Sequence, residues 1–233
     1  MSINSLINMG IKLKDIHPEI NMFVNDLNFF GKQLSMKGYL PANSGNASIL
    51  LSSDASEQVL RKVKYQTDKI SFDSLPSLKK LRRDGRTHYN VESLEKDLLK
   101  KYVEKLDERL IIITATGAKL WDIERNPDKR ICILKMSPKL DGFHIMFGNK
   151  EWGIIPSIEV GIHLIANSIN ICNKLPSSAV FHSHPISLIA TASHIKINNS
   201  YKELNKILYT QKEGLVTNIP ELIGLTKYEP SRI

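Results

Sequence analysis

Cysteine is scarce in this sequence, and long hydrophobic runs are absent from it. Its two cysteines, Cys132 and Cys172, are too few for a disulfide framework, and both lie in apolar runs, which predicts buried, reduced thiols. No apolar stretch approaches the roughly 18 residues of a membrane span. The first fifteen residues lack the basic start, apolar block and small-residue cleavage site of a signal peptide. We therefore expect a cytoplasmic protein with no membrane partner.

Acidic residues are in the minority, with 24 against 32 basic residues and a net charge of +8. A basic excess is compatible with nucleic acid, an anionic surface or a small phosphorylated substrate. The one dense basic cluster, KKLRRDGR at 79–86, has no aromatic side chains interleaved for stacking on single-stranded bases. We expect a solvated loop there and no nucleic-acid partner.

Apolar spacing predicts the secondary structure. Apolar residues recur at helical spacing from Ile20 to Leu34, and Gly38 follows, so we expect a helix over 20–36. A second apolar stretch of helical length begins after Ser157, a possible N-cap. Short apolar runs predict strands at 47–51, 110–114, 130–135, 142–147 and 178–183.

The order of these elements predicts a single α/β domain over 1–233. No helical pattern separates the strands between 110 and 147, which favours a mixed or antiparallel sheet, and the helix at 20–36 should cover it. The stretch 52–107 is polar and charge-rich, without a strong strand signal. We expect it to be an excursion from the core, with a helix from about Val91.

Two histidines form the sharpest local signal. His182 and His184 precede Pro185 at a predicted strand end. Residues two apart in a strand point to the same face, so both imidazoles could approach one cation such as zinc. On local sequence alone, two histidines on a solvated strand face are an equally good interpretation.

Two loops have the small polar residues that suit anion recognition. They are SGN at 44–46 and TATGAK at 114–119. Backbone amides in such turns can bind phosphate, although Gly, Ser and Asn are also the commonest turn residues. Neither GxxxxGK[ST] nor GxGxxG occurs, so nucleotide binding loses support.

Glu159 lies after a loop and at the start of an apolar helix. A carboxylate there is favoured by the helix dipole, so a capping role is one interpretation. Beside a polarised carbonyl, the same carboxylate could instead take a proton from the adjacent carbon.

Taken in order, the motifs SGNAS, TATGAKL, IPSIEVGIH and FHSHP resemble the class II aldolase and adducin head family. In that family a Gly-Asn loop, a Thr-x-Ser/Thr-Gly loop, a catalytic glutamate and an HxHP pair follow one another. The resemblance covers roughly residues 20–230 and implies a three-layer class II aldolase-like domain, with the sheet flanked by helices.

The resemblance also implies an activity. It is the zinc-dependent cleavage of a ketose 1-phosphate, of the L-rhamnulose 1-phosphate type, to dihydroxyacetone phosphate and an aldehyde. Glu159 would be the general acid/base, and His182 and His184 would be two zinc ligands. A homotetramer is implied too. The residues that would bind the substrate or its phosphate are Asn43, Gly45, Asn46, Thr116, Gly117 and Ser157.

One family feature is missing. The family's third histidine ligand lies in a C-terminal His-Gly segment, and this sequence contains no His-Gly dipeptide. Two histidines predict weaker zinc binding than a complete site. A second function therefore stays open, that of a non-catalytic, adducin-like or C-terminally truncated member acting as an interaction module. The metal content of the purified chain would discriminate between the two.

Overall fold

The computed structural model describes residues 12–41, 45–63, 69–72, 103–106, 109–148, 154–172 and 178–186. The chain divides into two compact units, Met1–Ser183 and His184–Ile233. The helices and strands described below lie in the first unit. That the two units form the single domain expected from the sequence stays a prediction.

An antiparallel sheet forms the centre of the first unit. In the described part of the chain its strands follow one another in the order β2-β5-β4-β3-β1-β6, and every neighbouring pair is antiparallel. The strands are β1 (Asn46–Leu50), β2 (Ile70–Ser71), β3 (Leu110–Thr114), β4 (Ile131–Met136), β5 (Gly142–Phe147) and β6 (Ser178–His182). The five strands predicted from apolar runs are thus confirmed to within one residue at each end.

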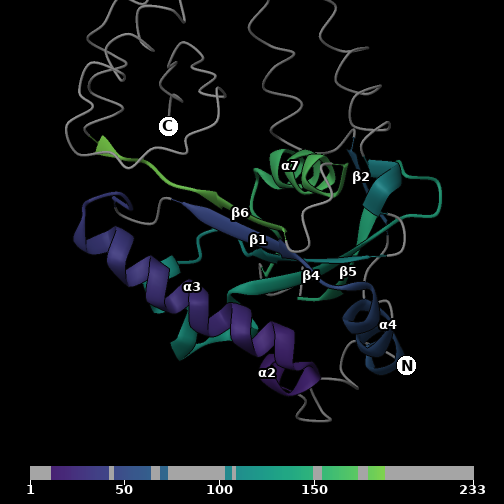
Figure 1. The fold of residues 1–233 in the computed structure, drawn as a ribbon, viewed down its shortest axis with the longest axis horizontal. Coiled ribbons are helices and arrows are strands. Elements are labelled where there is room, and N and C mark those ends of the chain that lie inside the picture. The colour runs from purple at the N-terminus through teal and green to yellow at the C-terminus, as the bar shows by residue number, and fades with distance from the viewer. Residues whose placement is uncertain are drawn as a thin grey trace, which may run out of the picture. The chain divides into compact units, whose positions relative to one another are not determined.

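Helices cover both faces of this sheet (Figure 1). Side chains alternate along β3, so Leu110 and Ile112 join one hydrophobic cluster, whereas Ile111 and Ile113 join the other. The arrangement confirms the three-layer α/β architecture expected from the sequence. The helices on the first face are α2 (Leu13–Ile16), α3 (Pro18–Met36) and α4 (Ser53–Lys62), and α7 (Val160–Cys172) lies on the second.

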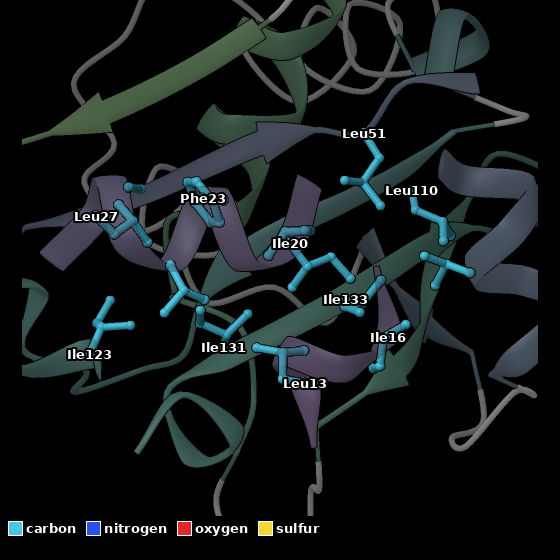
Figure 2. Packing of buried hydrophobic residues seen from close by; sticks show 14 of the residues in the cluster. Leu13, Ile16, Ile20, Phe23, Leu27, Leu51, Leu110, Ile123, Ile131 and Ile133 are labelled. Atoms are coloured by element: carbon cyan, nitrogen blue, oxygen red, sulfur yellow. The ribbon is translucent and has the colours of Figure 1, made fainter. Parts of the chain in front are cut away.

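The long helix α3 forms where the apolar spacing predicts it. His17 caps it, because its ring Nδ1 accepts a hydrogen bond from the backbone N–H of Glu19 at 3.2 Å. Figure 2 shows Ile20, Phe23 and Leu27 of α3 in one cluster with buried side chains of β4. These contacts bury the apolar stripe of the helix against the sheet.

Gly31 brings α3 close to the segment that follows β3. A Cβ at this position would lie 2.4 Å from the carbonyl oxygen of Leu120, in the 3-10 helix η3 (Leu120–Arg125). Only glycine allows so close an approach of the two backbones. The contact helps to hold the connection between β3 and β4.

The expectation that 52–107 is an excursion from the core is wrong for its described residues. Ser52 caps α4, which buries Ala55 and Val59 in the first cluster. The strand β2 pairs with β5, and Leu106 is fully buried in the second cluster. The strand β2 has only two residues, which is too short for a pattern, and α4 is mostly polar, so its few apolar residues are easily taken for a surface segment. The basic cluster at 79–86 and the helix expected from about Val91 lie outside the described residues.

The two cysteines differ. Cys132 on β4 is buried, as expected, and burial raises the pKa of its thiol. Cys172 is exposed, so the expectation of burial is wrong for it. Cys172 is the last residue of α7. This helix carries apolar residues on several sides, but its buried residues lie on the side that packs on the sheet. Apolar neighbours in sequence do not show which side of a helix a residue occupies.

In the described part of the chain, no helix is both long and apolar enough to span a membrane.

Candidate active site

A group of polar side chains meets at one end of the sheet, on the face that α7 covers. Asn46 is the first residue of β1 and His182 is the last residue of β6, and the two lie opposite each other in the strand pairing. Glu159 directly precedes α7. Three segments that are far apart in the sequence therefore contribute to one site.

The carboxylate of Glu159 is the centre of this group. Its Oε2 accepts a hydrogen bond from Nδ2 of Asn46 at 2.5 Å and contacts Nδ1 of His182. The side chains of Glu159 and His182 are 28% and 36% exposed. The carboxylate is thus held in place, yet it remains within reach of a small molecule from solvent. Its partners are side chains, so the capping interpretation does not describe its main contacts.

Electrostatics keep this carboxylate ionised. Burial acts to raise the pKa of Glu159, but the hydrogen bonds from His182 and Asn46 outweigh burial, and the pKa lies below its ordinary value. The ionised form is the one that accepts a proton.

A buried histidine lies behind Asn46. His163, on the first turns of α7, is 1% exposed. Its Nε2 contacts Oδ1 of Asn46, and its Nδ1 lies 2.7 Å from Oγ of Ser48. Burial lowers the pKa of His163 to about 4, so the ring is neutral at physiological pH.

Asn167 completes this buried group. Its Nδ2 donates hydrogen bonds to Oγ of Ser48 at 2.9 Å and to the carbonyl oxygen of His163 at 2.8 Å. We did not predict roles for Ser48, His163 or Asn167 from the sequence. A signal was present, because positions 159, 163 and 167 are polar at helical i, i+4, i+8 spacing within an apolar stretch.

Gly45 has a steric role beside the site. Its φ is +90°, and a Cβ there would lie 2.9 Å from the carbonyl oxygen of His182 and 2.6 Å from Cδ2 of Leu40. Glycine therefore lets the start of β1 approach the end of β6. Asn43 and Ser44, in the same predicted loop, lie outside the described residues.

The second predicted loop is tied to the segment that carries Glu159. The backbone N–H of Thr116 donates to the carbonyl of Ile155, and its hydroxyl donates to the carbonyl of Pro156, both at 2.8 Å. Ser157 donates from its backbone to the carbonyl of Thr114 at 3.0 Å. The hydroxyl proton of Thr116 is thus used within the protein. The backbone N–H of Ala118 is used as well, because it donates to the carbonyl of Ala115 at 3.0 Å. The N–H of Gly117 is therefore the feature of this turn that could face an anion.

Gly117 and Ser157 differ in surroundings. Gly117 is exposed with a φ of +73°, and a Cβ there would have nothing within 4 Å. Ser157 is buried, and its Oγ accepts from the backbone N–H of Glu159 at 3.3 Å. Ser157 therefore stabilises the turn before α7. The N–H group that it binds belongs to Glu159, one residue before the helix begins at Val160.

His184 lies beyond the end of β6 and belongs to the second unit. The alternation argument for two imidazoles on one face holds only within a strand, so it does not extend to His184. Where His184 stands relative to Glu159 stays a prediction. Among the described residues, no group of three or more His, Cys, Asp or Glu side chains could hold a metal ion.

Comparisons with known proteins agree with the motifs. No family model matches the chain. The chain is 20% identical over 169 residues to a rhamnulose-1-phosphate aldolase of Listeria welshimeri, which covers 72% of this chain and 50% of that protein. The chain thus spans half the length of this curated relative.

A solved structure shares the fold. The crystal structure of a sugar-phosphate aldolase from Thermotoga maritima superposes with a TM-score of 0.51 at 18% identity, covering 81% of this chain and 64% of that one. The curated relative supports the resemblance to the class II aldolase and adducin head family, and to L-rhamnulose-1-phosphate aldolase within it, while the solved structure supports the fold.

Proposed function

We propose that this chain, which resembles the class II aldolase and adducin head family in sequence and fold, is an aldolase-type lyase. Its substrate would be a ketose 1-phosphate of the L-rhamnulose 1-phosphate type, and its products dihydroxyacetone phosphate and an aldehyde. The observation that carries the proposal is the partly exposed, ionised carboxylate of Glu159, held by Asn46 and His182 where β1 and β6 end together.

Glu159 would be the general acid/base of the reaction. In aldol cleavage, a base accepts the proton of the hydroxyl on the carbon that becomes the aldehyde, and a proton is then delivered to the enediolate carbon that the broken bond leaves behind. The lowered pKa keeps the carboxylate deprotonated and so able to accept. Its two side-chain partners keep it in one orientation, and its 28% exposure leaves one side for the substrate.

A divalent metal, zinc in this proposal, would be held by His182 and His184. The chemistry of His182 fits a ligand, because its Nδ1 faces a carboxylate and a metal-binding histidine commonly directs its second ring nitrogen to such a group. When bound, the metal would withdraw electrons from the ketone and stabilise the negative charge that develops as the carbon–carbon bond breaks. The His-Gly segment that carries the family's third histidine ligand has no counterpart in this sequence.

The phosphate and the rest of the substrate would be positioned by the two loops. The residues are Asn43, Gly45, Asn46, Thr116, Gly117 and Ser157. The direct hydrogen bonds between the second loop and the segment before Glu159 support this assignment, because they keep the anion-binding turn at a constant distance from the carboxylate. We further propose a cytoplasmic homotetramer.

The test is cleavage of L-rhamnulose 1-phosphate by the purified chain with excess zinc, followed as release of dihydroxyacetone phosphate. With two histidine ligands from this chain, we expect little turnover even with excess zinc, and we expect Glu159→Gln to abolish it without a change of fold. Glu124→Gln is the matched control, because Glu124 also accepts an amide hydrogen bond at 2.5 Å, from Asn28, away from the site. No turnover by the zinc-loaded wild type would favour the interaction-module alternative.

Metal binding is tested separately. We expect zinc content, measured by mass spectrometry after dialysis, to fall in both His182→Ala and His184→Ala. His144→Ala serves as the control, since His144 lies on β5, outside the candidate site. Equal zinc content in all four proteins would reject these two ligands.

A further inference from the structure

We propose that the buried His163 is a positioning residue, which fixes the side-chain amide of Asn46 so that its N–H group always faces Glu159. Ser48 and Asn167 would fix the tautomer of His163 in turn. The inference rests on the proposed function only for its kinetic consequence. The orientation itself follows from contacts within the first unit of the chain.

The direction of each hydrogen bond follows from the carboxylate. An ionised carboxylate only accepts, so Asn46 must present its Nδ2 to Glu159 and its Oδ1 to the other side. That oxygen faces Nε2 of His163, which must therefore carry a proton.

The remaining contacts agree with that tautomer. In a neutral imidazole protonated at Nε2, Nδ1 is an acceptor, so the hydroxyl of Ser48 donates to it across 2.7 Å. The oxygen of Ser48 then accepts from Nδ2 of Asn167 at 2.9 Å. One direction of hydrogen bonding therefore runs from Asn167 through Ser48, His163 and Asn46 to Glu159.

This chain of hydrogen bonds removes an ambiguity. An asparagine amide can rotate by half a turn, and the rotated form would direct Oδ1 at the carboxylate of Glu159, which is repulsive. In that form Nδ2 would also face the N–H of His163, so two donors would meet in a buried place. The contact with His163 and the contact with Glu159 therefore both favour the orientation in which Nδ2 of Asn46 faces Glu159.

The spacing of the four residues along β1 and α7 places their side chains opposite one another. Asn46 and Ser48 are two apart on β1 and point to the same face, while His163 and Asn167 are four apart on α7. The strand and the helix pack against each other through these pairs. The same contacts exclude His163 as a third metal ligand, because both of its ring nitrogens are engaged and the side chain is buried.

Two variants of His163 separate positioning from packing. His163→Leu fills a similar volume but donates no hydrogen bond. His163→Gln retains an amide N–H that can take the place of Nε2–H. The first readout is the side-chain amide of Asn46, observed by nitrogen NMR in the protein without metal or substrate and assigned with Asn46→Asp. Its N–H protons should exchange slowly with solvent while both sides of the amide are held.

We expect His163→Leu to speed the solvent exchange of the Asn46 side-chain N–H protons at least about tenfold and His163→Gln to restore much of the wild-type rate, because only the latter keeps Asn46 oriented. In the kinetic assay, His163→Leu should lower kcat at least about tenfold with little change in KM, since the substrate is bound but the carboxylate is misplaced. Zinc content should not change in either variant.

The outcomes are distinguishable. Unchanged exchange of the Asn46 amide protons in a folded His163→Leu protein would overturn the inference, whether or not the wild type cleaves the sugar phosphate. Faster exchange in a chain without aldolase activity would uphold the positioning role and reject the proposed function. If His163→Leu does not fold, Ser48→Ala decides the matter, because it removes the hydroxyl that donates to Nδ1 of His163 and accepts from Asn167, and it should speed the same exchange by a smaller factor.

Discussion

Asn46 and His182 are direct partners in the pairing of β1 with β6, and both side chains reach the same carboxylate oxygen of Glu159. Residues opposite each other on antiparallel strands lie close on one face of the sheet. The site therefore depends on this strand register. A shift of β6 by one residue against β1 would direct His182 to the opposite face of the sheet, away from Glu159.

Replacement of Asn46 by Asp should raise the pKa of Glu159. The change is nearly isosteric, but it exchanges a hydrogen-bond donor for a second carboxylate beside the first, and like charges disfavour joint ionisation. Carbon NMR titration measures the effect. Asn28→Asp is the control, because Asn28 donates to Glu124 at the same 2.5 Å distance and should leave the titration of Glu159 unaltered. Identical Glu159 titrations in both variants would show that Asn46 does not act on this carboxylate.

Alanine at Gly45 should cost more stability than alanine at Gly117. Both glycines have positive φ, so each substitution carries a backbone strain of about 1 kcal/mol. At Gly45 the new Cβ also meets the carbonyl oxygen of His182 at 2.9 Å, whereas at Gly117 it meets open space. Urea unfolding should show a further loss of about 1–3 kcal/mol for Gly45→Ala. Equal losses would mean that the close approach of β1 to β6 is easily relaxed.

Acid should destabilise the protein through His163. In the folded chain burial lowers its pKa to about 4, against an ordinary value of 6.5. Between these two values the unfolded chain binds a proton that the folded chain does not, so stability is lost as pH falls from 6.5 toward 4. The loss attributable to this residue is roughly 3 kcal/mol.

Unfolding free energies of the wild type and His163→Gln, measured between pH 7 and 4, check this expectation. The carboxylates titrate in both proteins, so the difference between the two curves isolates the histidine. We expect the curves to converge as pH falls. Parallel curves would argue that His163 is accessible to protons in the folded chain.

Leu106→Ala should destabilise the protein by about 2–5 kcal/mol, because the residue is fully buried in the second hydrophobic cluster and its truncation leaves a cavity. Met36→Ala is the comparison, since Met36 is 74% exposed and its truncation should change stability by less than about 0.5 kcal/mol. Chemical denaturation measures both. A negligible change in the unfolding free energy for Leu106→Ala would indicate that 103–106 is a surface excursion after all.

Local patterns were sufficient for much of the fold. The helix α3 and the strands at 110–114 and 142–147 follow from apolar spacing, because period and length distinguish a long amphipathic helix from a short buried strand. They failed for 52–107, where α4 and β2 are short and mostly polar, and for Cys172, whose exposure depends on which side of α7 meets the sheet.

The order of four motifs was enough to identify the family resemblance, and with it Glu159 and His182 as candidates. The resemblance also implies that these two residues meet, and the structure shows that they do, but what lies behind them was decided by the tertiary structure alone. Asn46 and Glu159 are 113 positions apart, and only the placement of β1 beside β6 and beneath α7 brings them within hydrogen-bond distance. The sequence neighbours of His163 are apolar and predict only a helix, whereas its hydrogen-bond partners Asn46 and Ser48 lie on a strand. A local pattern carries no information about such pairs, because their contact is set by the packing of a helix face on a sheet face.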